Sequence, residues 1–147
     1  MADELSDLNF ADDLAEVSQV AETTRWKIEK GGALEIYVDI SSAKEPREIF
    51  QARLLWNSYP GEEPPSLKFR DPATGRLDMP TAWPVVRGFR PANLDACVNW
   101  CAEGFATHPE WRNDANLRWQ HTGNCILRVL RILQRELDEH FTGRFKQ

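Results

Sequence analysis

Residues 59–69 read Tyr-Pro-Gly-Glu-Glu-Pro-Pro-Ser-Leu-Lys-Phe, and this run constrains the architecture of the chain more than any other. Proline fixes its own φ angle, lacks a backbone N–H donor and keeps the residue before it extended. Three prolines within six positions therefore predict a stiff, non-helical connection. Residues 48–57 before the run and residues 66–69 at its end both have the composition of strands. The run thus predicts a rigid link between two strands.

The clearest strand pattern lies upstream of this link. Residues 33–40 alternate between apolar and polar side chains, and the apolar set is Leu34, Ile36, Val38 and Ile40. Such alternation is typical of a half-buried strand in an antiparallel sheet. Together with residues 49–56 and 66–69, this segment predicts an antiparallel meander of three strands.

Amphipathic helices are predicted at both ends of the chain. The first runs from Leu5 to about Ala21, and its apolar positions include Leu5, Leu8, Phe10, Leu14 and Val17. The second covers residues 124–141 and is the strongest helix signal, with Ile126, Leu130, Leu133, Leu137 and Phe141 at spacings of three and four. Gly143 is a plausible stop for it.

The segment between the meander and the last helix has no long periodic pattern. Residues 70–89 are predicted to be irregular, because Pro80 and Pro84 exclude a helix between them. Residues 94–100 suit either a strand or a helix, and residues 102–120 are loop-like. Because no β-α-β repetition is present, the predicted fold class is α+β, with a long irregular crossover before the C-terminal helix.

The overall composition is that of one soluble domain spanning residues 1–147. The net charge is −5, and the first 24 residues carry seven acidic residues and no lysine or arginine. That segment is either a solvated helix face or a docking helix for a basic partner. We expect no nucleic-acid partner, since clustered basic residues are missing. No apolar run is long enough for a membrane helix and the acidic start is unlike a signal peptide, so we expect a cytoplasmic protein without a membrane partner.

The proline-rich link resembles the Tyr-Pro…Pro-Pro-x-x-x-Phe connection of ubiquitin-conjugating (E2) enzymes. The predicted order of helix, meander, long crossover and helix is similar to the UBC-like fold of that family. In the family, the crossover carries a Pro-Asn pair and then the active-site element Cys-Leu-Asn/Asp. Here Pro91 and Asn93 are similar to the former, and Cys97-Val98-Asn99 looks like the latter. Arg90 stands where the family has a histidine, and Ala92 separates Pro91 from Asn93.

The resemblance implies an enzyme that transfers a ubiquitin-like protein. An E1-like adenylating enzyme would load the modifier onto a cysteine as a thioester, and the chain would pass it to an amine of a target protein. The departures from the family pattern suit a divergent, bacterial-type protein of the kind found with E1-like and ubiquitin-like genes in antiviral operons. Such a protein needs no metal or organic cofactor of its own.

Cys97 is the predicted nucleophile, and Cys101 is the alternative. An unpaired cysteine is also commonly a small, inert core residue. Asn93 is the candidate donor to the oxyanion of the tetrahedral intermediate, or else a turn residue. Asp95 and Asp114 are candidates for tuning the incoming lysine, although both could be ordinary surface carboxylates.

His108 could supply a base or shape the entrance to the thioester, and a loop histidine before proline is the alternative interpretation. Cys97 and Cys101 also form a loose set of possible zinc ligands with His108, His121 and Cys125. Their spacing lacks the paired short intervals of structural zinc sites. A last alternative is a catalytically inactive E2 variant or a related RWD-type domain, which binds proteins without transferring anything.

Overall fold

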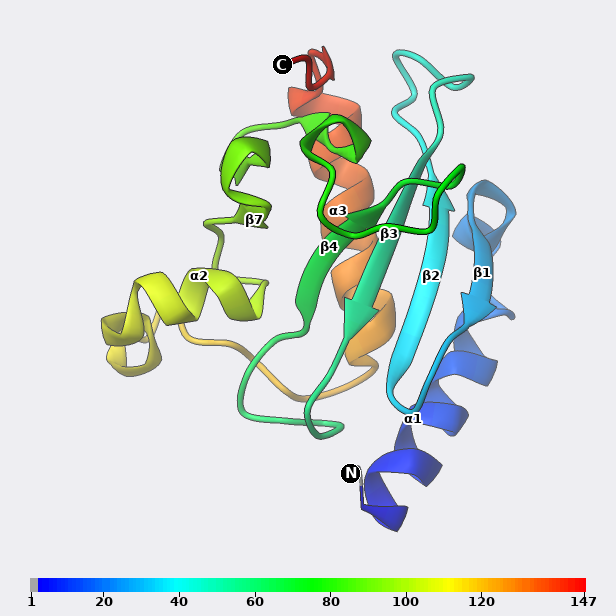
Figure 1. The fold of residues 1–147 in the computed structure, drawn as a ribbon. Coiled ribbons are helices and arrows are strands. Elements are labelled where there is room, and N and C mark those ends of the chain that lie inside the picture. Colours follow the sequence, from blue (N-terminus) through cyan, green and yellow to red (C-terminus); the bar gives the residue numbers. More distant parts are fainter. Residues whose placement is uncertain (1–2) are drawn as a thin grey trace.

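Four antiparallel strands form the central sheet, in the spatial order β1-β2-β3-β4 (Figure 1). The computed structural model describes residues 3–147. The strands are β1 Lys27–Lys30, β2 Glu35–Ile40, β3 Phe50–Leu55 and β4 Ser66–Arg70. The last three are the predicted meander, whereas β1 was not predicted and the expected count of three strands is wrong. In β1, Ile28 is flanked by charged residues, and pairing with β2 opposite Val38 defines it as a strand.

Helix α3, Cys125–His140, lies across one face of this sheet (Figure 1). The predicted alternation holds, because Ile36, Val38 and Ile40 of β2 are all buried on the helix side. Asn124 caps the helix, since its Oδ1 accepts the backbone N–H of Leu127 at 3.0 Å. The chain is therefore an α+β protein with an antiparallel sheet, an N-terminal helix and a C-terminal helix.

The N-terminal helix α1 spans Glu4–Val17 and is capped by Asp3, whose Oδ1 accepts the Ser6 N–H at 2.7 Å. It ends four residues before the predicted Ala21, where the short 3-10 helix η1, Ala21–Arg25, begins. The buried residues of α1 are Ser6, Phe10 and Val17, whereas Leu5 and Leu8 are 66% and 58% exposed. The expectation that Leu5 and Leu8 belong to the apolar contact face is therefore wrong.

The proline-rich link is held by Tyr59 at its start. The Tyr59 ring packs edge-on against Phe10 of α1 and Trp56, with centroids 5.2 and 5.6 Å away. Its hydroxyl donates to a carboxylate oxygen of Asp13 and accepts the N–H groups of Cys125 and Ile126, at 3.1 and 3.3 Å. The link is therefore fixed to both terminal helices at once.

The crossover after β4 is mostly irregular, as predicted. It contains short elements: η2 Pro80–Ala82, β5 Pro84–Val85, β6 Phe89–Arg90, η3 Pro91–Asn93 and β7 Asp95–Ala96. Strand β5 pairs with β8, Gly143–Arg144, beyond α3. Residues 94–100 hold only the two-residue strand β7. Residues 102–120 are not a simple loop, because they contain helix α2, Ala102–Thr107, and η4, Pro109–Asn113.

Candidate active site

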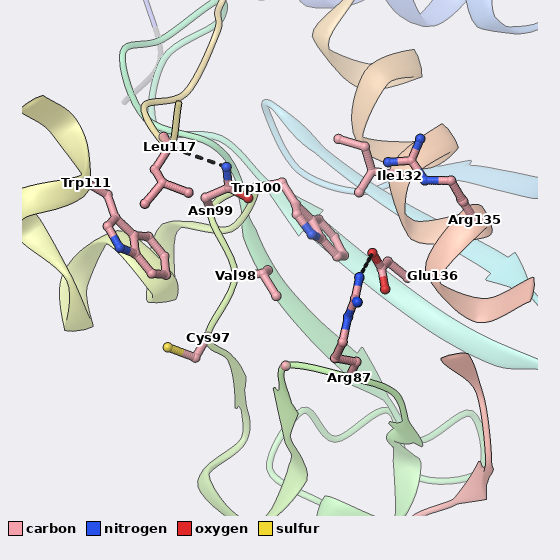
Figure 2. Close-up of a pocket in the computed structure, with 11 residues that line it drawn as sticks. Arg87, Cys97, Val98, Asn99, Trp100, Trp111, Leu117, Ile132, Arg135 and Glu136 are labelled. Atoms are coloured by element: carbon pink, nitrogen blue, oxygen red, sulfur yellow. Dashed lines mark hydrogen bonds and ion pairs between the residues drawn. The ribbon is translucent and has the colours of Figure 1, made fainter. Parts of the chain in front are cut away.

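A hollow of about 520 Å³ lies between the crossover and α3, and Cys97 lines it (Figure 2). We call it the Cys97 hollow. Its walls come from the β5–β6 turn, the segment after β7, the region around η4, and one face of α3. The lining residues are Arg87, Gly88, Cys97, Val98, Asn99, Trp100, Trp111, Leu117, Ile132, Arg135 and Glu136.

The backbone of Cys97 is fixed by the neighbouring β5–β6 turn. Its N–H donates to the carbonyl oxygen of Gly88 at 2.8 Å. Gly88 has a φ of +84°, and a Cβ there would lie 2.8 Å from Cγ1 of Val98. A side chain at position 88 would therefore be strained and would press on the residue next to Cys97.

Helix α2 closes the other side of the Cys97 segment, and the proline-rich link holds α2. The N–H of Ala102 donates to the carbonyl of Pro65 at 2.8 Å, and the Glu103 carboxylate accepts the N–H of Leu67 at 3.1 Å. A Cβ on Gly104 would lie only 2.0 Å from the carbonyl oxygen of Val98. Glycine at 104 thus lets α2 pack directly on the backbone beside Cys97.

The three thiols differ in their access to solvent. Cys97 is half-buried, whereas Cys101 and Cys125 are buried. Burial raises the pKa of the Cys101 thiol well above its ordinary value of 9.0, and burial also raises the pKa of Cys125. A nucleophilic thiol must be both accessible and able to ionise. Among the cysteines of the described residues, only Cys97 is accessible to solvent. Cys101, the alternative nucleophile, is buried.

The amide nearest in sequence to Cys97 within the hollow is Asn99. Its Nδ2 donates to the backbone oxygen of Leu117 at 3.3 Å, which ties the Cys97 segment to the loop after η4 (Figure 2). Asn93, the predicted oxyanion donor, lies in η3 with its side chain exposed, and it does not line the hollow. The sequence did contain a signal for Asn99, because it ends the Cys-Val-Asn element.

The other predicted side chains do not line the hollow. Both carboxylate oxygens of Asp95 accept hydrogen bonds from Arg90 at 2.8 Å, across the β6–β7 pair. His108 stacks on Trp111, with ring centroids 4.4 Å apart, and its Nδ1 lies 3.1 Å from a carboxylate oxygen of Glu110. Asp114 is exposed and accepts the N–H of Asn116 at 2.8 Å. His108 touches the hollow through the Trp111 ring, and the Asp114 backbone is hydrogen-bonded to two lining residues, Trp111 and Leu117, each at 3.1 Å.

The charged groups of the hollow were not predicted from the sequence. Arg87 donates to Oε1 of Glu136 at 3.3 Å, and Arg135 lines the same wall (Figure 2). Oε2 of Glu136 is buried and has no hydrogen-bond partner in the described chain. Two cations and one carboxylate therefore line the α3 side of the hollow, and the Cys97 thiol points away from them (Figure 2). These residues come from elements far apart in sequence, so no local motif could have grouped them.

Within residues 3–147, no group of three or more His, Cys, Asp or Glu side chains is placed to hold a metal ion. The five possible zinc ligands of the sequence are therefore not brought together as one site. No helix in the same range combines the length and apolar composition needed to cross a bilayer. Compared with known proteins, the chain matches no protein-family model, no curated protein and no solved structure.

Proposed function

We propose that this chain is an E2-like conjugating enzyme of UBC-like fold, in which Cys97 carries a ubiquitin-like protein as a thioester. The observation that carries the proposal is the placement of the Cys97 thiol. It is the one thiol of the described chain that is not buried, and it lines a hollow between the crossover and α3. The proline-rich link that resembles the E2 connection also holds α2 against this segment.

The reaction needs two acyl transfers. In the first, the Cys97 thiolate attacks the modifier's thioester on the E1-like enzyme, a new thioester forms on Cys97, and the cysteine of the E1-like enzyme leaves as a thiolate. In the second, a target amine attacks the Cys97 thioester, the tetrahedral intermediate collapses, and the Cys97 thiolate leaves as an amide forms. The amine loses its proton to a base during this step.

An amide donor would stabilise the oxyanion of that intermediate. Asn93 is the donor that the resemblance suggests, and Asn99 is the one whose side chain lines the hollow. Asn99 would have to exchange its 3.3 Å hydrogen bond to Leu117 for one to the oxyanion. Comparing Asn93→Ala with Asn99→Ala in the transfer step distinguishes the two.

The partner surface that loads Cys97 would recognise α1. The exposed side of this helix carries Leu5 and Leu8 together with acidic side chains such as Glu4, Asp7 and Asp12. An apolar groove bordered by lysine or arginine would complement it. This charge pattern suits an E1-like protein with a basic docking surface.

The proposal is tested by expressing the tagged chain in its native host with its neighbouring genes and measuring intact mass without reductant. The wild type should carry an added small protein that reductant removes. Cys97→Ser should lose this adduct or hold it as an ester that resists reductant, and Cys101→Ser is the matched control. An adduct that persists in Cys97→Ser but disappears in Cys101→Ser would overturn the assignment of Cys97.

A second function, a non-catalytic protein-binding module, is favoured by two observations. Asn93 is outside the hollow, and Asp95 is engaged by Arg90 rather than directed at a substrate amine. This alternative predicts no adduct on any form of the chain while an active E1-like partner is present. The same intact-mass experiment therefore separates the two functions.

A further inference from the structure

A second hollow, of about 470 Å³, lies on the sheet face opposite α3. Its lining residues are Arg53, Lys68, Arg76, Leu77, Asp78 and Leu94, and we call it the Arg53 hollow. The crossover segment after β4 passes in front of the sheet at this point (Figure 1). None of these residues lines the Cys97 hollow, so the two sites are separate.

Arg53, in the middle of β3, is the unusual residue of this hollow. Its side chain points away from α3, because its neighbours Ala52 and Leu54 face the core. It is only 9% exposed, yet its Nε is buried without a hydrogen-bond partner. Nη2 donates to Oγ of Ser66 at 2.8 Å, and the guanidinium forms no ion pair with a described residue. Ser66 in turn donates to the Glu103 carboxylate, so Arg53 reaches that negative charge only through a hydroxyl. A buried cation without a direct counter-charge is costly, and an anion in the hollow would relieve that cost.

Two further cations face the same space. Lys68 stands directly opposite Arg53 in the β3–β4 register, and its Nζ donates to the carbonyl of Leu94 at 2.6 Å. Arg76 borders the entrance and is held by Asp78 through hydrogen bonds of 2.8 and 2.9 Å. Glu103 of α2 forms an ion pair with Lys68 at 3.9 Å. Three cations thus meet two carboxylates, Asp78 in the lining and Glu103 beside it, in a chain whose net charge is −5.

The remaining walls of the hollow are apolar, since Leu77 and Leu94 line it together with the aliphatic stems of the cationic side chains. We propose that the Arg53 hollow binds a small organic oxyanion, a phosphate or carboxylate group carried on an apolar body. Arg53 and Lys68 bind the anionic group, because a guanidinium fork and an ammonium suit oxyanions. Leu77 and Leu94 contact the body of the ligand.

The test is a titration of the full chain with phenyl phosphate, followed by NMR at the Nε–H group of Arg53. The signal should shift and saturate. Inorganic phosphate should bind at least several-fold more weakly because it lacks the apolar body, and phenol should cause no saturable shift. Benzoate in a parallel titration distinguishes a carboxylate ligand from a phosphate ligand.

Two charge-removing variants make the test specific. Lys68→Gln keeps a donor for the Leu94 carbonyl but removes the charge, and it should weaken binding about tenfold. Arg131→Gln is the control. It also removes one positive charge, but from an exposed arginine outside the hollow that is paired with Glu22. This control should bind like the wild type. Shifts that never saturate, or equal weakening in both variants, would overturn the proposal.

Discussion

The hydroxyl of Tyr59 shows how much structure can depend on a single residue. It joins Asp13 of α1 to the first two N–H groups of α3, and these partners lie 46 to 67 residues away in sequence. The sequence predicted the stiff link to which Tyr59 belongs, because proline acts locally. It could not predict the hydrogen bonds of Tyr59, because no local pattern identifies partners at such distances.

Tyr59→Phe should therefore lower the free energy of unfolding by about 1–3 kcal/mol, since it leaves two buried N–H groups and Asp13 without a partner. Urea denaturation measures the change. Tyr37→Phe is the control, because no side-chain hydrogen bond of Tyr37 is seen in the described chain and its ring stacks under Arg70. Equal loss of stability in both variants would contradict the role given to the Tyr59 hydroxyl.

The same residue predicts a pH effect on stability. Burial, followed by the hydrogen bond to Asp13, raises the pKa of Tyr59 above its ordinary value of 10.0. The folded chain thus favours the neutral phenol, and this contribution is complete below about pH 10 and lost as the pH rises further. Above that pH, stability should fall less steeply in Tyr59→Phe than in the wild type.

Among the helices and strands, those with a long apolar periodicity could be predicted from the sequence, whereas the short ones could not. Strand β2 and helix α3 each bury one regular apolar face, so their patterns identify them. Strand β1 has four residues with one apolar side chain, and pairing with β2 defines it. Helix α2 has six residues with a glycine in the middle, which is a poor local signal for a helix. The glycine at position 104 is needed because the helix packs directly on the backbone of Val98. A contact with a residue outside the helix cannot be predicted from the six residues of the helix itself.

Gly104→Ala should consequently displace α2 from the Cys97 segment. The new Cβ would clash with backbone atoms, which cannot move aside as a flexible side chain does, so we expect a destabilisation of about 1–3 kcal/mol. Chemical denaturation measures it, and the backbone NMR signals of residues 97–99 should shift. Gly32→Ala is the control, since a Cβ there meets only Oε1 of Glu35 at 3.6 Å. An unperturbed Cys97 segment in Gly104→Ala would contradict this packing.

For the whole molecule, one carboxylate connects three distant parts. Asp138 of α3 accepts two hydrogen bonds from Arg25 of η1, at 2.9 and 3.0 Å, and one from the N–H of Ala43 at 2.9 Å. Burial alone would raise the pKa of Asp138, but the hydrogen bonds from Arg25, Ala43 and Gln134 outweigh it and hold the pKa below 3.8. Asp138 therefore stabilises the fold above that pH, and the contribution is lost as the pH falls toward the folded-state pKa.

Asp138→Asn should lower stability at about pH 7 and make it less dependent on pH between about 5 and 2. Denaturant unfolding curves at several pH values measure both effects. Glu139→Gln, which removes the adjacent and largely exposed carboxylate, should change the pH dependence less. Identical acid sensitivity in the wild type and in Asp138→Asn would contradict this account.

The Tyr59 contact also determines how partners of α1 can be studied. Because Asp13, Phe10 and Ser6 are tied to Tyr59 and its ring cluster, α1 is an integral part of the hydrophobic core rather than a removable arm. Deleting α1 would uncover the core, so lost binding after truncation would report unfolding instead of a missing contact. Only substitutions at the outward side chains, such as Leu5 and Leu8, separate recognition from structural integrity.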